Sequence, residues 1–394
     1  MIIVFWISLF IVFYTFAGYG ILLYILIRLK RVFKGKPVIP HPESDLLPIC
    51  TLVVAAYNEQ FFIEDKITNT LKLNYPEGKL KFLFITDGST DKTPEIISRY
   101  PQIQLMHQPH RAGKIAAIHR AMEYVDTEIV VFTDANTLLN PDAIMMICRH
   151  YADKAVGAVA GEKRVQMDES ADASAAGEGF YWKYESALKK WDSELYSVVG
   201  AAGELFSVRR ELYKDVRPDA ILDDFMISMY IAEKGYRIIY EPEAYAIETA
   251  SENVTEELKR KIRIAAGGIQ SILWLKGLLN PFKYPILCFQ YVSHRVLRWT
   301  VTPFLLILVF ILNAVIVFNP RETFYQLILF AQILFYVLAL LGLIMEKRQI
   351  RIKALFIPYY FCVMNYAIFM GIHRYITKTQ SAAWDKAQRK QSSI

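Results

Sequence analysis

The sequence predicts an α/β domain in the middle of the chain, flanked on both sides by helices that belong to a membrane. Two observations support this fold class. First, 54% of the 394 residues are hydrophobic and only 21% are charged, and the apolar residues gather in uncharged runs near both ends. Second, the middle of the chain alternates short apolar runs with stretches of helical periodicity. Together they exclude a disordered chain, a disulfide scaffold and a purely soluble enzyme.

The N-terminal end has the pattern of a membrane-spanning helix. Residues 1–27 contain no charged side chain, and five basic residues follow within 28–36. About 20 apolar residues are enough to cross a bilayer, and positive residues stay on the cytoplasmic side. We therefore expect a transmembrane helix over 1–28, a basic linker over 29–47 and the middle of the chain in the cytoplasm, at a bacterial inner membrane.

The segment after the middle also points to a membrane. Residues 256–299 combine Lys and Arg with aromatic residues, which predicts amphipathic helices on the inner membrane surface. Two long uncharged runs within 300–345 are separated only by Arg321 and Glu322. This spacing predicts a transmembrane hairpin that returns the chain to the cytoplasmic side.

The last part of the chain allows two interpretations. Segment 346–375 begins with a basic loop and continues as an uncharged run that contains Pro358. Because both flanks of this run are basic, we favour an interfacial or re-entrant segment, and a true span stays open. Residues 376–394 then form a basic tail on the cytoplasmic side.

The net charge of +6 does not indicate nucleic-acid binding. The basic excess lies in three clusters, 28–36, 346–353 and 373–394, which together outweigh the net charge, so the rest of the chain is net acidic. A nucleic-acid binder would need a basic stripe through the folded middle. The clusters are better explained as membrane-topology signals that contact lipid head groups.

The middle of the chain has the pattern of βαβ units. Apolar runs bounded by turn residues predict strands, and the stretches between them predict helices, which implies a mostly parallel sheet. The expected strands are 49–55, 80–85 and 128–132, and the expected helices are 60–73 and 112–124. Each strand is followed by polar residues. Because ligands in open α/β sheets bind beyond the carboxyl ends of the strands, these polar residues predict a binding site.

The chemistry of these strand ends favours a nucleotide diphosphate. The sequence contains neither a GxGxxG nor a GxxxxGK[ST] motif, so the usual dinucleotide and phosphate loops are missing. Aspartates at strand ends suit a hard cation, and such a cation suits a diphosphate. Lys114 opens a predicted helix, where phosphate is favoured. The alternative is that Asp87 and Asp134 are turn residues and Lys114 is solvated.

Five motifs, taken in order, resemble those of membrane-bound family 2 glycosyltransferases. This group includes the cellulose, chitin and hyaluronan synthases. The motifs are Val53-Val-Ala-Ala-Tyr-Asn-Glu59, Asp87-Gly-Ser-Thr-Asp91, Asp134-Ala-Asn-Thr137, Leu222-Asp-Asp-Phe225 and Gln270-Ser-Ile-Leu-Trp274. The resemblance implies a Rossmann-like GT-A fold over 48–255, a nucleotide-sugar donor and inversion at the anomeric carbon. It also implies a divalent cation, Mg²⁺ or Mn²⁺.

The resemblance also implies roles for the residues that would hold the donor, which is expected to be a UDP-sugar. Lys114 faces the diphosphate, and Asp134 and Asn136 stand where the family holds its metal ion. Asn136 replaces an aspartate, and an amide oxygen is a ligand without charge. The residues expected to border the nucleotide are Ala56, Tyr57, Glu59 and, on the uracil side, Asp87.

The acidic pair before the next helix implies a general base. By resemblance Asp224 takes the proton of the acceptor hydroxyl, and Asp223 tunes its neighbour or borders the acceptor. The alternative is that both acids cap the helix. Gly203 and Glu204 correspond to the family segment beside the acceptor sugar, although a tight turn without a ligand is the alternative.

Two further motifs depart from the family pattern. Gln270 and Trp274 are expected at the acceptor, but Leu273 replaces the arginine of the QxxRW motif, which weakens the case for processive synthesis. In the alternative, Trp274 anchors an interface helix. Trp384 and Arg389 loosely resemble a gating loop that closes over the nucleotide, and the alternative is a basic tail on anionic lipid.

The expected function is therefore transfer of a sugar to a glycan acceptor. Two interpretations stay open: a polysaccharide synthase, with an oligomer or an export partner, or a non-processive enzyme that adds one sugar to a lipid-linked or glycolipid acceptor. A catalytically inactive glycan-binding scaffold is a third interpretation. The presence of Asp87, Asp134 and Asp224 argues against it.

Overall fold

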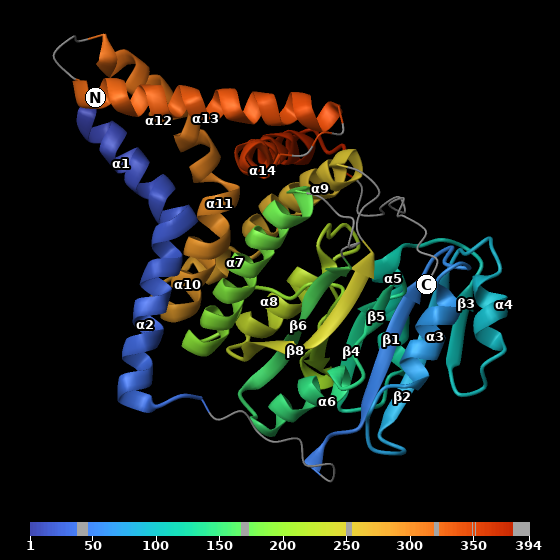
Figure 1. Cartoon of the computed structure of the whole chain (residues 1–394). Helices are drawn as coiled ribbons and strands as arrows, with labels where there is room; N and C mark the ends of the chain where they lie inside the picture. The colour runs from blue at the N-terminus through green and yellow to red at the C-terminus, as the bar shows by residue number, and fades with distance from the viewer. Residues whose placement is uncertain are drawn as a thin grey trace. The chain divides into compact units, whose positions relative to one another are not determined.

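The computed structural model describes residues 1–37, 46–166, 173–249, 254–318, 323–348, 350 and 352–380. The chain divides into two compact units (Figure 1). One, the helical unit, contains Met1–Leu29, Met167–Leu188 and Asn253–Gln380. The other, the sheet unit, contains Lys30–Gln166 and Lys189–Glu252.

The sheet unit is built on one eight-stranded sheet with the order β3-β2-β1-β4-β7-β6-β8-β5. Its strands are β1 (Cys50–Ala56), β2 (Leu80–Asp87), β3 (Gln104–Gln108), β4 (Ile129–Asp134), β5 (Thr137–Leu139), β6 (Val156–Gln166), β7 (Leu205–Arg209) and β8 (Arg237–Thr249). The three strands expected from the sequence are confirmed as β1, β2 and β4, with ends within two residues of the prediction. The topology is a mixed sheet of the GT-A type.

The expectation of a mostly parallel sheet is confirmed for four of the seven strand pairings, because β6 and β8 also pair in parallel. Strands β1 to β4 pair in parallel, as helical crossovers require. Strand β7, however, pairs antiparallel with both β4 and β6, and β5 pairs antiparallel with β8. These pairings join segments far apart in the chain, so no local pattern specifies their direction.

Helices cover the sheet and carry part of the site. In the sheet unit these are α3 (Ile63–Leu71), α4 (Thr93–Ser98), α5 (Lys114–Tyr124), α6 (Ala143–Cys148), α8 (Asp223–Glu233) and the short turns η3 (Arg149–Ala152) and η4 (Arg210–Leu212). Helix α7 (Ala173–Leu195) contributes residues to both units. The helices predicted over 60–73 and 112–124 are confirmed as α3 and α5.

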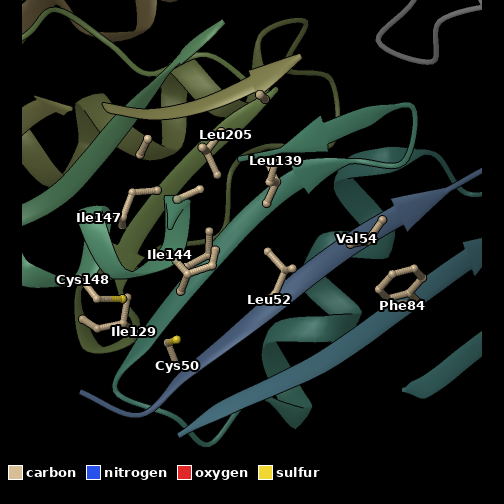
Figure 2. Close-up of a cluster of buried hydrophobic side chains, with 14 of the residues drawn as sticks. Cys50, Leu52, Val54, Phe84, Ile129, Leu139, Ile144, Ile147, Cys148 and Leu205 are labelled. Atoms are coloured by element: carbon tan, nitrogen blue, oxygen red, sulfur yellow. The ribbon is translucent and has the colours of Figure 1, made fainter. Parts of the chain in front are cut away.

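The core of the sheet unit follows from the alternation of side chains along the strands (Figure 2). Alternate residues of β1, namely Cys50, Leu52 and Val54, are fully buried in one cluster. Ile144 and Ile147 of α6 are fully buried in the same cluster. This apolar layer holds the strands in place, and the polar residues that follow them fall at the strand ends.

The helical unit contains the apolar segments. Its N-terminal helix consists of α1 (Ile2–Phe13), η1 (Tyr14–Gly18) and α2 (Tyr19–Lys34), the last turn of which enters the sheet unit. The other helices are α9 (Val254–Trp274), η5 (Lys276–Leu279), α10 (Pro285–Tyr291), η6 (Val292–Val296), α11 (Leu297–Trp299), α12 (Val301–Val317), α13 (Thr323–Lys347) and α14 (Lys353–Ile376).

Three described helices are long and apolar enough to cross a membrane: Ile2–Lys34, Thr323–Lys347 and Ala354–Ile376. A fourth crossing results if Pro285–Trp299 and Val301–Val317, which are bent by 56° at their junction, act as one broken span. The expected N-terminal span and the second helix of the expected hairpin thus correspond to helices of sufficient length. Helix α14 also has the length and composition of a span, so both interpretations of this segment remain open.

A buried ionic cluster stabilises the helical unit. The side chain of Glu185, from α7, is 4% exposed and lies 3.0 Å from His294 Nε2, 3.2 Å from Arg295 and 3.0 Å from Arg298. Burial raises the pKa of Glu185, but the three basic side chains outweigh burial and hold this pKa well below its usual value. One carboxylate therefore joins α7 to the η6–α11 segment of the same unit.

Candidate active site

The candidate active site lies at the carboxyl ends of β1, β2 and β4, which lie side by side in the sheet (Figure 1). The parallel register brings these ends to one level, because Ala56 is opposite Thr86 and Ala55 is opposite Asp134. The sheet therefore brings the three polar motifs predicted from the sequence to one edge.

The turn that carries the predicted metal ligands is held by its own threonines. Strand β4 ends at Asp134 and β5 begins at Thr137. Thr137 Oγ1 donates a 3.0 Å hydrogen bond to the Asp134 carbonyl oxygen, and Thr133 Oγ1 donates a 2.8 Å bond to the Glu204 carbonyl oxygen. Asp134 and Asn136 are both partly buried on this fixed turn.

Side chains of helix α3 form hydrogen bonds with the same turn and with strand β5. Lys66 is fully buried, and its Nζ donates to the Thr137 carbonyl oxygen at 2.8 Å and to Thr133 Oγ1 at 3.1 Å. One helical turn on, Asn69 donates to the Leu139 carbonyl oxygen and accepts from the Leu139 N–H, both at 2.8 Å. Burial lowers the pKa of Lys66 to about 7, against the opposing charge of Asp134.

Sequence reasoning missed Lys66. A signal was present, because Lys66 falls on the apolar face of the predicted helix, between Ile63 and Ile67, which are fully buried. A lysine on such a face needs acceptors from the segment against which the helix packs.

Lys114 lies among the acids of the site. Its Nζ is 2.7 Å from Asp134 Oδ1 and 4.0 Å from Asp223 Oδ2. A β-carbon added at Gly203 would lie 3.4 Å from Lys114 Nζ and 3.2 Å from Asp224 Oδ2. Burial lowers the pKa of Lys114, but the three aspartates outweigh burial and raise it above its usual value. The structure therefore brings together Lys114, Asp134 and both acids of the pair.

Asp224 has the properties of a general base. Burial, and then the charge of Asp223, raise the pKa of Asp224 to about 7, although Lys114 acts in the opposite direction. A base with a pKa near the working pH transfers protons well. Asp224 Oδ1 also accepts a 2.8 Å hydrogen bond from the Phe225 N–H at the start of α8. One carboxylate oxygen thus orients the side chain, and the other faces Gly203.

Asp87 fixes the loop that begins α5. Its Oδ2 accepts hydrogen bonds from the N–H groups of Ala112 at 2.8 Å and Gly113 at 2.6 Å, and its Oδ1 lies 3.5 Å from Arg120. Gly113 has φ +98°, a conformation that favours glycine. These contacts place Lys114. The expected contact between Asp87 and a base stays a prediction.

The other residues expected to border the nucleotide lie at or just after the end of β1. Ala56 is 4% exposed, and the Arg111 guanidinium lies 4.1 Å from the centre of the Tyr57 ring. The Glu59 N–H donates a 2.8 Å hydrogen bond to Thr93 Oγ1. These residues join the turn after β1 to the segments after β2 and β3, as a nucleotide site assembled from several strand ends requires.

Glu204 belongs to a second charged group. Its Oε1 lies 2.5 Å from Lys163 Nζ, and the same ammonium pairs with Glu248. The side chain of Lys163 is 3% exposed, so this lysine fixes Glu204 beside Gly203. Sequence reasoning missed Lys163, because its acidic partners Glu204 and Glu248 are distant from it in the chain.

The other predicted residues are not part of this geometry. Gln270 and Trp274 lie on α9 of the helical unit, where Gln270 is 6% exposed and Trp274 is partly buried. Trp384 and Arg389 lie outside the described residues. The roles expected for these four residues stay predictions.

The chemistry of the turn suits a divalent cation that is shared with a ligand. Asp134 and Asn136 offer hard oxygen donors, which Mg²⁺ and Mn²⁺ prefer, and the Lys114 ammonium shows that Asp134 accommodates a positive charge at contact distance. Among the residues that the structure describes, no three His, Cys, Asp or Glu side chains group so as to hold a metal ion. The donor's phosphates would have to complete the coordination.

The fold and the strand-end site define the class of protein, and comparison with known proteins agrees. Residues 51–217 match the Glycosyl transferase family 2 model. Residues 51–217 therefore resemble a family whose description is that of a glycosyl transferase, which agrees with the class expected from the motifs.

The relatives point to a particular group within this class. A poly-beta-1,6-N-acetyl-D-glucosamine synthase of Staphylococcus aureus (strain COL) is 29% identical over 245 residues, which cover 59% of this chain and 58% of the relative. The same synthase of Staphylococcus epidermidis is 26% identical over 276 residues, 67% of this chain and 66% of the relative. The chain thus spans roughly three fifths to two thirds of these relatives and is homologous to a polysaccharide synthase.

One solved structure shares the fold along nearly the whole chain. The mannosyltransferase PcManGT from Pyrobaculum calidifontis, solved in complex with GDP-Man and Mn²⁺, has a TM-score of 0.69. The match covers 96% of this chain and 100% of that chain at 24% sequence identity. It shows a common GT-A architecture, including the helices outside the sheet unit.

Proposed function

We propose that the protein transfers a sugar, with inversion, from a nucleotide-diphosphate donor to a glycan acceptor at the cytoplasmic face of a membrane. The convergence of Asp134, Asp223 and Asp224 on Lys114 carries this proposal. One cationic and three acidic groups at the end of a GT-A sheet can hold a diphosphate through a cation and still offer a carboxylate to an acceptor.

In the mechanism, each side chain has one task. Asp134 and Asn136 would hold Mg²⁺ or Mn²⁺, which neutralises the charge of the leaving diphosphate. Lys114 and the N-terminus of α5 bind the phosphate oxygens. Asp224 accepts the proton of the acceptor hydroxyl as that oxygen attacks the anomeric carbon on the side opposite the diphosphate, which inverts its configuration. Asp223 raises the basicity of Asp224 through its charge.

The relatives support an N-acetylhexosamine donor and a polymeric product. Their names specify a poly-beta-1,6-N-acetyl-D-glucosamine synthase, which favours UDP-N-acetylglucosamine as the donor and a growing glycan as the acceptor. Leu273 at the arginine position of the QxxRW motif favours the second candidate, non-processive transfer of one sugar to a lipid-linked or glycolipid acceptor.

The basic cluster at the end of the N-terminal helix supports a cytoplasmic position of the catalytic domain. The helix Ile2–Lys34 ends within the basic cluster 28–36, and positive residues stay on the cytoplasmic side. This orientation brings the catalytic domain to cytoplasmic nucleotide-sugars.

The test uses the purified full chain in detergent with UDP-N-acetylglucosamine, other UDP-sugars and GDP-mannose, each with Mn²⁺. Released nucleoside diphosphate and product size are measured for the wild type, Asp224→Asn and the control Asp219→Asn, an exposed aspartate of the same segment paired with Arg217. A ladder of products that Asp224→Asn abolishes supports the synthase. One added sugar supports the second candidate, and equal release by the wild type and Asp224→Asn contradicts the proposed mechanism.

A further inference from the structure

Lys114 pairs with the carboxylate that the proposed cation would need. Its ammonium is 2.7 Å from Asp134 Oδ1, and Asp134 is the one charged ligand of the turn, because the second oxygen donor is the amide of Asn136. A divalent cation on the same carboxylate would lie at contact distance from a full positive charge. Like charges so close repel each other in a partly buried site, so the two cations compete for Asp134.

The structure gives Lys114 freedom to leave. A quarter of its side chain is exposed. The backbone before it is fixed, since Asp87 binds the N–H groups of Ala112 and Gly113. The loop therefore stays in place while the flexible four-carbon stem of Lys114 changes partner.

A diphosphate provides the alternative partner. Lys114 is the first residue of α5, a helix of 11 residues, and the N–H groups of a first helical turn attract phosphate oxygens. A phosphate there lies within reach of Lys114 along its own helix. Its arrival draws the ammonium off Asp134 and leaves that carboxylate to the cation.

We propose, on the basis of the proposed function, that Lys114 is an exchangeable internal cation that makes metal binding conditional on the nucleotide. Without nucleotide, Lys114 neutralises Asp134 and the cation binds weakly. With a nucleoside diphosphate bound, Lys114 pairs with the phosphates and the cation takes its place on Asp134. The site thus avoids holding a bare metal ion and assembles when the donor is present.

The test measures binding without turnover. The full-length protein in detergent is titrated with Mn²⁺, free Mn²⁺ is followed by electron paramagnetic resonance, and each titration is done without nucleotide, with UDP and with GDP, against protein-free nucleotide blanks. For the wild type, we expect the nucleoside diphosphate to tighten Mn²⁺ binding about tenfold or more. For Lys114→Met, we expect Mn²⁺ alone to bind about tenfold more tightly than to the wild type, and the nucleotide to add less.

Matched variants control for charge and folding. Lys81→Met removes a lysine paired with Asp126 at 2.8 Å, a similar distance, but exposed and outside the site, and it should leave the Mn²⁺ titration unchanged. Lys114→Arg keeps the charge and should keep the conditional binding. Thermal unfolding of each variant reports on folding, and if Lys114→Met does not fold, Lys114→Gln takes its place.

Two outcomes overturn the inference. If the wild type binds Mn²⁺ and nucleotide but Lys114→Met binds Mn²⁺ alone no more tightly than the wild type, Lys114 does not compete for Asp134, and the proposed function still stands. If the wild type binds neither Mn²⁺ nor either nucleotide, the proposed function fails together with this inference.

Discussion

At the scale of single residues, Asp224 links catalysis to stability. Burial and Asp223 raise its pKa to about 7. A carboxyl group whose pKa is raised by folding contributes stability below its usual pKa, and this stability is lost as the pH rises through the raised value. Above pH 7, Asp224 is therefore ionised in the folded protein, and its buried charge lowers the free energy of unfolding.

This linkage predicts opposite effects of Asp224→Asn on function and on folding. Sugar transfer should fall about 100-fold or more. At pH 8 the free energy of unfolding should rise by on the order of 1–3 kcal/mol, with little change at pH 4, because the amide is never charged. Thermal unfolding at both pH values and diphosphate release measure the two effects. A loss of stability at pH 8 would contradict the assignment.

We expect the charge of Asp223 to influence the pH dependence of sugar transfer. Removing its charge in Asp223→Asn lowers the pKa of Asp224, because the like charge that opposes ionisation is gone. The acidic limb of kcat/KM, which reports the free enzyme, should therefore move to lower pH than in the wild type. The control Asp219→Asn should leave the midpoint in place. An unchanged or higher midpoint in Asp223→Asn would show that Asp224 is not the titrating group.

At the scale of elements, α3 stabilises the turn that carries Asp134 and Asn136. Asn69 pairs with both backbone groups of Leu139, so Asn69→Ala leaves a donor and an acceptor unsatisfied. We expect unfolding to become easier by about 1–3 kcal/mol and the Mn²⁺ concentration needed for activity to rise. Asn74→Ala, which removes only an exposed 2.8 Å bond to Asp142, is the control and should change neither quantity. Equal effects of the two variants would contradict a stabilising role of Asn69 at this turn.

The elements also show what the sequence could predict. Strands β1, β2 and β4 are apolar runs that stop at polar residues, so their ends and the residues there, including Asp87 and Asp134, were predictable from local pattern. The burial of Lys66 was signalled by its place on the apolar face between Ile63 and Ile67, but its partners were not predictable, because they lie on another segment. Strand β7 was not predictable either, because its direction depends on pairing with β4 and β6.

At the scale of the whole molecule, the helical unit depends on one buried carboxylate. Glu185→Gln leaves His294, Arg295 and Arg298 without their shared counter-charge in a buried site, which typically costs about 3–5 kcal/mol. We expect a marked loss of thermal stability in detergent and a lower yield of folded protein. Glu256→Gln, which breaks an ion pair with the exposed Lys259, should cost under about 1 kcal/mol. Similar stability of the two variants would show that the buried cluster is dispensable.

Membrane topology decides whether the tail can take part in the site. Among the described residues, helices for up to four crossings are present, and if α12 and α13 both cross, α14 determines on which side the residues after Gln380 lie. If α14 lies in the interface, as its basic flanks favour, the tail is cytoplasmic and Trp384 and Arg389 share a compartment with the catalytic domain. We therefore expect a green fluorescent protein fused to the C-terminus of the full chain to fluoresce, and an alkaline phosphatase fused there to be inactive.

A cysteine introduced into the basic cluster 28–36 marks the side of the membrane on which this cluster lies. Lys36→Cys, in the basic linker that follows the predicted N-terminal span, should resist a membrane-impermeant maleimide in intact cells and react after lysis, because this cluster is expected to be cytoplasmic. If α12 and α13 both cross, a protected Lys36→Cys together with an active C-terminal phosphatase shows that α14 crosses the membrane as well. The gating role predicted for Trp384 and Arg389 is then excluded, while the site around Lys114 and Asp224 is unaffected, because it is built entirely within the sheet unit.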